Sequence, residues 1–447
     1  MPKYEIELNK VYQIPKEISI VNYDNKIIVI APEFANWIIL NSPSQLAIFE
    51  FLRKGHSIQD SLSNSLFDVH DVNYLVTQLE ARKFCDKKVH SSIEDKRGLH
   101  LYLTNKCNLS CPHCYMYSGL STENELTTEE IIKLIKDYKE IVHGNLITIS
   151  GGEPTIHADF DLIVKTASEM ELEVKVLTNG TLMTPDRINK IAKYIQSVQI
   201  SIDGYSEDSN SIIRGKNNFD KALLAVDLFV KLGIETSIAI APPIEFLKNH
   251  LDEYICFAKE LSSKYQGKSF HIKFAEELIH GRNISPSKKF NKEYYELIKK
   301  IQEHLYGQDY EVMTFVRTLY NNVIIDNCMF GVFAVASNGD VFFCARIGDL
   351  LPVANVRTST IEEIFEKSST AEKVTLITNL KPCKECDLRF ICGGGCRIEE
   401  FPELVKRKSF EGIDIGKIPP KHCTPQIKNK FYDLMIRSNK YMYRPLD

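Results

Sequence analysis

The chain has 447 residues, of which 44% are hydrophobic and 26% are charged, a balance typical of folded globular proteins with two or three domains. Its formal net charge is -4, and its Lys and Arg residues are scattered, so we expect no nucleic-acid partner. No window approaches about 18 consecutive apolar residues, and the stretch MPKYEIELNK lacks the layout of a secretory signal. We therefore expect a cytoplasmic protein without a membrane-spanning segment.

Residues 1–90 are predicted to form a small separate module. Strands are expected at 18–23, 26–31 and 36–40, with a turn at Asp24 and Asn25 between the first two. Helices should follow, one bracketed by Ser42 and Gly55, one started by a capping box of Ser57 and Asp60, and one whose apolar face is Val72, Leu75, Val76 and Leu79. Three strands followed by three helices is a winged-helix-like order.

From about residue 97 the pattern changes to strands that alternate with helices. Strands are expected at 99–104, 146–150, 173–178, 198–202, 235–240 and 270–274, and a capping box of Thr127 and Glu130 should start the helix between the first two. This alternation predicts an α/β fold with a parallel sheet, specifically a partial (βα)6 TIM-like barrel over residues 97–310. Its active site should lie at the carboxyl ends of the strands.

Cysteine is concentrated in two parts of the chain, with twelve residues in all. A cytoplasmic compartment keeps thiols reduced, so metal binding or catalysis is favoured over disulfides. Cys107, Cys111 and Cys114 directly follow the first barrel strand. A disulfide pair with a spare thiol and a chance cluster of buried cysteines are the alternatives. Three thiolates on a short loop can also hold three irons of a cubane and leave the fourth iron open.

The spacing CxxxCxxC at this place resembles the signature of the radical S-adenosylmethionine (SAM) enzymes. The resemblance implies a 4Fe-4S cluster whose open iron binds SAM, and cleavage of SAM to a 5'-deoxyadenosyl radical. It also implies that His113 lies near adenine, that Gly151, Gly152, Glu153 and Pro154 contact the SAM amino group, and that Asn179, Ser201 and Arg214 hold the ribose and carboxylate. Each of these motifs alone is more often a turn or a structural feature.

Seven further cysteines lie in the last third of the chain, at Cys328, Cys344, Cys383, Cys386, Cys392, Cys396 and Cys423. A zinc ribbon is the alternative reading, but seven thiolates do not divide into two complete four-ligand sites. The array resembles the SPASM extension, which carries two auxiliary 4Fe-4S clusters, and we assign that domain to residues 311–447. The resemblance implies an outer cluster on Cys383, Cys386, Cys392 and Cys423, and an inner cluster on Cys328, Cys344 and Cys396.

The inner set is one ligand short. Some SPASM relatives supply an extra cysteine where this chain has Ala334, so the resemblance implies an open iron or a non-cysteine ligand. Sulfatase-maturing relatives place an acidic base directly after the second cysteine, where this chain has Ala345, which disfavours formylglycine formation. Cys85 and Cys256 lie outside both patterns, and we expect them to be buried apolar thiols.

The first 90 residues resemble the leader-recognition element of ribosomal-peptide (RiPP) maturation systems, a winged-helix module. That resemblance implies that a leader peptide adds a strand beside the third strand and packs against the third helix. A nucleic-acid-binding winged helix is the alternative, but residues 67–84 mix both signs of charge.

Together these features predict a radical SAM maturase that cross-links a precursor peptide, with a Cys-sulfur-to-carbon thioether of the sactipeptide or ranthipeptide type as the favoured product. Carbon-carbon cross-linking or another oxidative peptide modification is the alternative, and a non-catalytic iron-sulfur redox sensor is the alternative of another class. The expected partners are the precursor peptide and an electron donor such as flavodoxin or ferredoxin.

Overall fold

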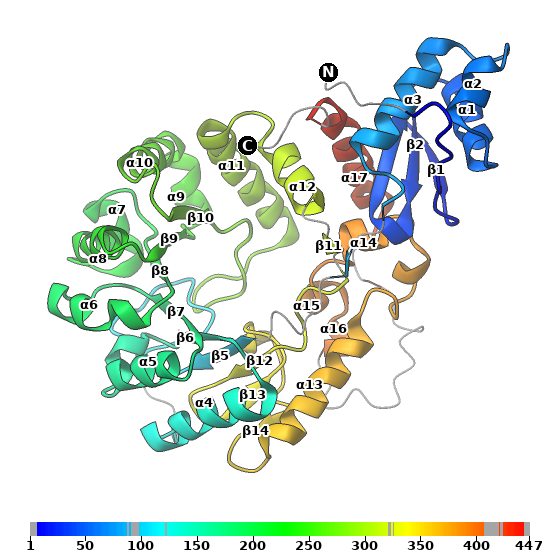
Figure 1. Ribbon diagram of the computed structural model, residues 1–447. Coiled ribbons are helices and arrows are strands. Elements are labelled where there is room, and N and C mark those ends of the chain that lie inside the picture. The colour runs from blue at the N-terminus through cyan, green and yellow to red at the C-terminus, as the bar shows by residue number, and fades with distance from the viewer. Residues whose placement is uncertain are drawn as a thin grey trace.

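The computed structural model describes residues 7–86, 89–90, 98–120, 123–320, 323–324, 326–405, 420 and 423–441. A central sheet carries helices on its outer side, and the N-terminal strands and helices lie at the far end of the molecule, beside the C-terminal helix (Figure 1). The arrangement places the C-terminal part of the chain between the central sheet and the N-terminal elements.

The central sheet contains the six predicted barrel strands, all parallel and in sequence order. They are β5 (Gly98–Tyr102), β6 (Leu146–Ser150), β7 (Glu173–Thr178), β8 (Ser197–Ser201), β9 (Glu235–Ile240) and β10 (Phe270–Phe274). Helices separate them along the chain: α4 (Thr128–Val142), α5 (Phe160–Glu169), α6 (Pro185–Ile191), α7 (Glu207–Arg214), α8 (Phe219–Lys231), α9 (Ile244–Asn249) and α10 (Leu251–Lys264). The prediction of an α/β fold with a mostly parallel sheet is confirmed.

Helix α4 shows how local sequence fixes these elements. The Thr127 hydroxyl accepts a hydrogen bond from the Glu130 N–H at 3.3 Å, and the Glu130 carboxylate accepts one from the Thr127 N–H at 2.8 Å. The predicted capping box is therefore present, and it satisfies two of the N–H groups that a helix start leaves without partners. The apolar face of the helix, with Ile131, Leu134, Ile135 and Tyr138, is buried and packs into the main core.

The sheet does not end with the barrel, which the sequence did not predict. Strand β12 (Phe333–Val335) lies parallel to β5, and β13 (Asp340–Phe342) and β14 (Ala354–Asn355) extend the same sheet in antiparallel pairing. Helices α11 (Lys288–Tyr306) and α12 (Tyr310–Tyr320) precede this extension. The C-terminal region follows with α13 (Ile361–Thr375), α14 (Arg389–Cys392), α15 (Arg397–Glu400), α16 (Pro402–Val405) and α17 (Pro425–Ser438).

The N-terminal elements have the predicted order. Strands β1 (Ser19–Tyr23), β2 (Lys26–Ala31) and β3 (Asn36–Leu40) form an antiparallel sheet, followed by α1 (Pro43–Arg53), α2 (Ile58–Ser63) and α3 (Val69–Ala81). The predicted turn is confirmed, since Asp24 and Asn25 have positive φ. The module is not isolated, however. One sheet face, with Ile28, Ile30 and Trp37, packs in one core with residues of the C-terminal region such as Leu388 and Met435.

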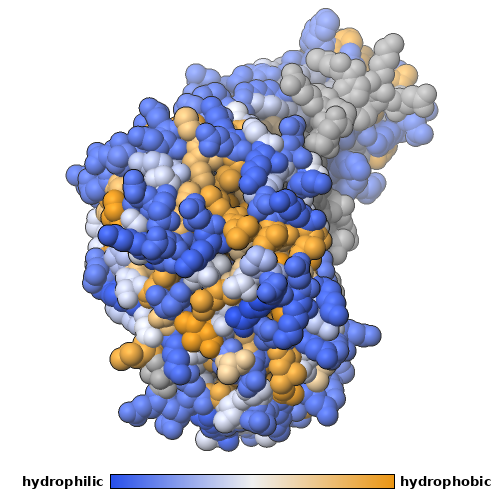
Figure 2. All heavy atoms as spheres, turned by 90° about the vertical axis from the view of Figure 1, so that its left-hand side faces the viewer, coloured by the Kyte–Doolittle hydropathy of each residue, from blue (hydrophilic) through white to orange (hydrophobic). Residues whose placement is uncertain are grey.

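Figure 2 shows the side of the molecule that carries the outer helices, where hydrophilic surface is interrupted by apolar areas. Within the described part of the chain, no helix is both long and apolar enough to cross a bilayer. The expectation that Cys256 is buried is wrong, because it lies exposed on α10, and Cys85 is only partly buried. Its neighbours Ile255 and Phe257 are apolar and buried, and the helical period turns Cys256 itself outward.

Candidate active site

The first cysteine group lies on the loop that leaves the carboxyl end of β5. Cys111 is buried, and Cys107 and Cys114 are partly buried. Burial is the main cause that raises the pKa of the Cys107 thiol to about 11, and the nearby Glu153, Cys111 and Cys114 raise it further. The three thiols are therefore close enough to influence one another. Neighbouring buried thiols ionise with difficulty, and a bound metal cation stabilises them as thiolates.

A segment just after β10 holds this loop in place. The Arg282 guanidinium donates to the carbonyls of Cys111, at 3.2 Å, and of Ser118, and the Arg282 N–H donates to the Cys114 carbonyl at 3.1 Å. The Asn283 N–H donates to the Pro112 carbonyl at 2.7 Å. The segment after the last barrel strand thus holds the cysteine loop that follows the first barrel strand. Sequence reasoning missed Arg282, because only the fold brings it to the loop.

Gly151 and Gly152 serve close packing of two loops. A Cβ on Gly152 would lie 2.3 Å from the Lys106 carbonyl oxygen, and one on Gly151 would lie 2.5 Å from that of Thr104. The Gly152 N–H donates to the Thr104 carbonyl at 2.7 Å, which joins the GGEP segment to the start of the cysteine loop. The backbone that approaches these glycines is the protein's own, and their contact with SAM stays a prediction.

Glu153 is fully buried, and its carboxylate ties the ends of β6 and β7 together. It accepts hydrogen bonds from the hydroxyls of Thr155, at 2.5 Å, and Thr178, at 2.6 Å, and from the N–H groups of Thr155 and Asn179. Burial raises its pKa, and these four bonds oppose that shift. A carboxylate has about four acceptor positions. Three of these bonds fall on Oε1 and one on Oε2, so Oε2 keeps an acceptor position, and the expected contact with SAM remains a prediction.

A buried carboxylate that the sequence did not single out brings two predicted residues together. Asp203, which is 0% exposed, accepts from Arg214 Nε at 2.6 Å, from His113 Nε2 at 3.2 Å and from the Ala241 N–H at 2.7 Å. Burial alone would raise its pKa, but the charge of Arg214 and the hydrogen bonds from His113 and Ala241 hold it well below the usual range. The site thus contains its own balanced pair of charges.

One atom of this network has no hydrogen-bond partner among the residues that the structure describes. The Nδ1 atom of His113 is buried without a hydrogen bond, while Nε2 faces Asp203. Buried polar atoms in native proteins almost always have partners. A donor group on a bound molecule, such as the amino group of an adenine, would supply one, so the residues present fit the expected SAM at this position.

The other two predicted contacts lie at the neighbouring strand ends. Asn179 donates from its side chain to Asn108 of the cysteine loop at 2.9 Å and accepts from the Thr181 N–H and hydroxyl. Ser201 is the last residue of β8 and is partly buried. No hydrogen bond to another described residue involves its side chain. The structure therefore collects the predicted residues at the carboxyl ends of β5 to β8.

The four cysteines of the predicted outer set surround one cavity. It has a volume of about 710 Å³ and is lined by Cys383, Cys386, Cys392 and Cys423. Burial raises the pKa of the Cys383 thiol to about 11, followed by the proximity of Cys423 and Cys392. Four thiols around a hollow of this size provide the donors and the space for a four-iron cluster.

The predicted inner set is also brought together. The thiols of Cys328 and Cys396 share a hydrogen bond, which lowers the pKa of Cys328 and raises that of Cys396. Cys344 interacts electrostatically with Cys396. Ala334 is buried in β12 and pairs with Phe342, which lies two residues before Cys344 in the chain.

Two tyrosines lie between the barrel cysteines and the inner set. The hydroxyls of Tyr102 and Tyr115 are 3.2 Å apart, and Tyr115 interacts electrostatically with both Cys114 and Cys344. Tyr102 also donates to the Ala345 carbonyl. The first and second cysteine groups therefore meet across a pair of phenols, a feature that no motif in the sequence indicated.

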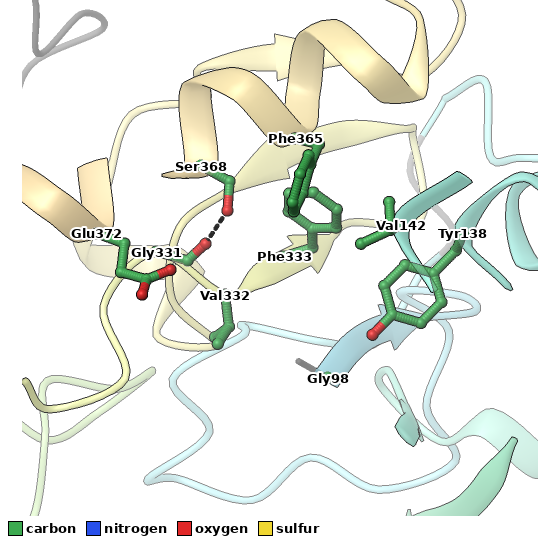
Figure 3. Close-up of a pocket in the computed structure, with 9 residues that line it drawn as sticks. All are labelled: Gly98, Tyr138, Val142, Gly331, Val332, Phe333, Phe365, Ser368 and Glu372. Carbon is green, nitrogen blue, oxygen red and sulfur yellow. Dashed lines mark hydrogen bonds between the residues drawn. The ribbon is translucent and has the colours of Figure 1, made fainter. Parts of the chain in front are cut away.

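Two further observations limit where the chemistry can be. Among the residues with described positions, no three His, Cys, Asp or Glu side chains are grouped as ligands of one metal ion. A four-iron cluster instead gives each thiolate its own iron. A small pocket where Gly98 and Phe333 meet Tyr138 and Phe365 lies at the amino-terminal end of β5, away from the cysteine loop, and no cysteine lines it (Figure 3).

Comparison with known families agrees with this geometry. Residues 101–253 match the radical SAM superfamily, and residues 327–387 match the SPASM iron-sulfur cluster-binding domain. The first match spans the cysteine loop and the strands that carry the proposed SAM contacts. The second contains four of the seven C-terminal cysteines, and Cys392, Cys396 and Cys423 lie beyond its end.

Similar proteins include peptide-modifying enzymes by name. The mycofactocin maturase MftC of Mycolicibacterium smegmatis is 26% identical over 340 residues, which cover 71% of this chain and 85% of that protein. The PqqA peptide cyclase of Bradyrhizobium diazoefficiens is 27% identical over 316 residues, covering 67% and 81%. The solved structure of native anSMEcpe with bound AdoMet and Cp18Cys peptide has a TM-score of 0.55 and 19% identity, covering 77% of this chain and 99% of that one. The last likeness shows a shared fold.

Proposed function

We propose that this chain, which carries a radical SAM domain followed by a SPASM domain, is a maturase that cross-links a ribosomally made peptide. The observation that carries the proposal is the spatial grouping of ten cysteines into sets of three, three and four. The first set lies beside the proposed SAM contacts, and the set of four lines a cavity. We assign three 4Fe-4S clusters to these sets.

The residues of the barrel site would hold and orient SAM. When bound, the cluster and SAM supply a carbon-centred radical that can remove a hydrogen atom from a substrate. Asp203 fixes the Arg214 guanidinium and the His113 ring, so both are held in place before a ligand enters. Arg214 keeps further donor groups beyond the one it gives to Asp203, and these suit a carboxylate. Arg282 keeps the cysteine loop against the last strand.

The names of relatives and the N-terminal elements both support a peptide substrate. One relative is named a maturase and another a peptide cyclase, and the anSMEcpe structure contains a bound peptide. In this chain β3 is an edge strand of its sheet, and the Tyr74 hydroxyl of α3 bonds to the Ile39 carbonyl at 3.0 Å. We assign the space between β3 and α3 to the leader peptide, which would add a strand to the sheet. The assignment of residues 1–90 as a winged-helix leader-recognition module belongs to this proposal.

The favoured product is a thioether between a substrate cysteine and a carbon atom. The inner cysteine set offers three thiols, and a substrate thiolate is a soft ligand suited to the remaining iron. Each thioether removes one hydrogen atom from carbon, the thiol proton and one further electron, so the peptide becomes lighter by two hydrogens. The auxiliary sites would accept the electron. Carbon-carbon cross-linking gives the same mass change and is the alternative.

Mass spectrometry with thiol alkylation tests this proposal. Precursor peptide incubated without oxygen with enzyme, SAM and a reductant should lose two hydrogens per link and one alkylatable thiol per link. A peptide without its leader should be modified at least tenfold more slowly. Loss of two hydrogens with every thiol still alkylated would replace the thioether by the carbon-carbon product. An unchanged peptide mass while SAM is cleaved would contradict the maturase assignment.

A further inference from the structure

Arg397 carries a buried positive charge between the two auxiliary cysteine sets. Its side chain is 0% exposed, and it directly follows Cys396 of the inner set. Its guanidinium interacts electrostatically with Cys328 and Cys396 of the inner set and with Cys383 and Cys392 of the outer set. It is therefore near both predicted clusters at once.

The hydrogen bonds of this guanidinium go to backbone carbonyls of ligand-bearing segments. Nη1 donates to Gly393 at 2.9 Å and to Gly395 at 2.7 Å, both between Cys392 and Cys396. Nη2 donates to Asp326 at 3.3 Å, two residues before Cys328, and Nε donates to Thr375 at 2.9 Å. The Arg397 N–H also donates to the sulfur of Cys328 at 3.3 Å.

The surrounding loop is shaped around this side chain. Gly394 has a φ of +75°, and a Cβ there would lie 3.1 Å from Arg397 Nη1 and 2.6 Å from Ile377 Cδ1. A side chain at this position would press on the guanidinium and strain the backbone. The loop between Cys392 and Cys396 thus encloses the guanidinium of Arg397.

No carboxylate among the residues that the structure describes forms an ion pair with Arg397. Carbonyl groups satisfy its donors but supply no counter-charge. A buried charge without an opposite charge is costly, and natural buried charges are paired. The groups near Arg397 that can carry negative charge are the thiols of the two sets, which become anionic when they ligate iron.

We propose that the guanidinium of Arg397 is the shared counter-charge of the two auxiliary clusters and raises the reduction potentials of both. The proposal rests on the assignment of clusters to these cysteines. A fixed positive charge favours the reduced cluster, which carries one more negative charge. Because one side chain lies beside both sets, its removal should move both potentials in the same direction. Arg397 would thus favour electron transfer from the substrate to the auxiliary clusters without touching the substrate.

The test compares three full-length variants, prepared without oxygen, by iron analysis and by redox titration followed by electron paramagnetic resonance. In Arg397→Gln, the reduced-to-oxidised ratio of each auxiliary cluster at a fixed potential should fall at least tenfold, which is 59 mV for a one-electron couple. The barrel cluster should change less than twofold, because Arg397 interacts with the cysteines of the two auxiliary sets and with none of the barrel cysteines. Arg397→Lys keeps the charge, and its auxiliary ratios should stay within threefold of the wild type.

The control is Arg187→Gln. Arg187 donates to Asp161 and to the Thr155 carbonyl in the barrel and is not adjacent to a cysteine. Its loss should therefore leave the auxiliary potentials unchanged. Unchanged potentials in Arg397→Gln, or a shift in only one auxiliary cluster, would overturn the proposal. If Arg397→Gln does not assemble its clusters, Arg397→Lys decides: wild-type potentials support the proposal, and a tenfold fall overturns it. Wild-type protein without auxiliary clusters would instead overturn the cluster assignment itself.

Discussion

Two arginines with little or no solvent exposure lie beside cysteine sets in this molecule, and their partners differ. In the barrel, the partly buried Arg214 donates to Asp203 at 2.6 Å, so the protein itself supplies its counter-charge. In the C-terminal region, the guanidinium of the fully buried Arg397 donates to backbone carbonyls and, among the described residues, has no carboxylate partner. The barrel arginine is thus paired before any cofactor binds, whereas the proposal gives Arg397 its counter-charge only when the neighbouring cysteines bind iron.

The difference separates two ways to build an iron-sulfur site. A preformed ion pair suits a site that must release and rebind SAM in every turnover, because the fold does not depend on the ligand. A site whose charge balance includes the cluster couples metal binding to folding.

Removal of the barrel cysteines should abolish SAM cleavage and leave the auxiliary region intact. In the triple variant Cys107→Ala, Cys111→Ala and Cys114→Ala, iron should fall from about twelve to about eight per chain, since each cluster holds four irons. Cleavage should be lost entirely, as measured by 5'-deoxyadenosine formation. Cys256→Ala is the control, because that exposed thiol lies outside the three sets. Retained cleavage in the triple variant would show that other cysteines bind the cluster.

Removal of iron should loosen the auxiliary region far more than the barrel. Without thiolates bound to iron, the buried charge of Arg397 lacks a counter-charge, a cost of about 3 kcal/mol or roughly a hundredfold in local opening. Hydrogen exchange of chelator-treated protein should therefore show at least hundredfold faster exchange in residues 389–400. Strands β6 to β8 should change by less than threefold. Equal loosening of both regions would remove the contrast.

The barrel ion pair should contribute to stability without a cofactor. Asp203→Asn leaves Arg214 buried without an opposite charge, and we expect a loss of about 3 kcal/mol in the free energy of unfolding. Tyr254→Phe is the matched control, since it removes only a hydroxyl that donates to the Asp203 carbonyl at 2.6 Å, and it should cost about 1 kcal/mol. Urea unfolding of iron-free protein measures both. A loss no larger in Asp203→Asn than in the control would show that the pair is not needed.

Much of the fold followed from local sequence. The six barrel strands and the boxes Thr127–Glu130 and Ser57–Asp60 are where the sequence placed them, because period and capping chemistry are local properties. Strands β12 to β14 were missed because each has only two or three residues and because β12 joins the sheet through β5, far along the chain. The packing of Trp37 against the C-terminal region was missed for the same reason.

The site followed from the sequence only in part. The spacing of the cysteines predicted their division into sets, and the structure places the members of each set close together. Asp203, Arg282 and Arg397 were missed, because their roles depend on burial and on contacts between distant segments. A charged residue in a sequence is most often exposed, so nothing marked these three as buried.

The central claim is that a radical derived from SAM removes hydrogen from a carbon atom of a peptide. The most direct test uses a precursor peptide with deuterium at its carbon positions, incubated without oxygen with enzyme, SAM and a reductant in ordinary water. Mass spectrometry of the 5'-deoxyadenosine should find at least one deuterium in each molecule formed during modification. Modified peptide accompanied by unlabelled 5'-deoxyadenosine would contradict the claim.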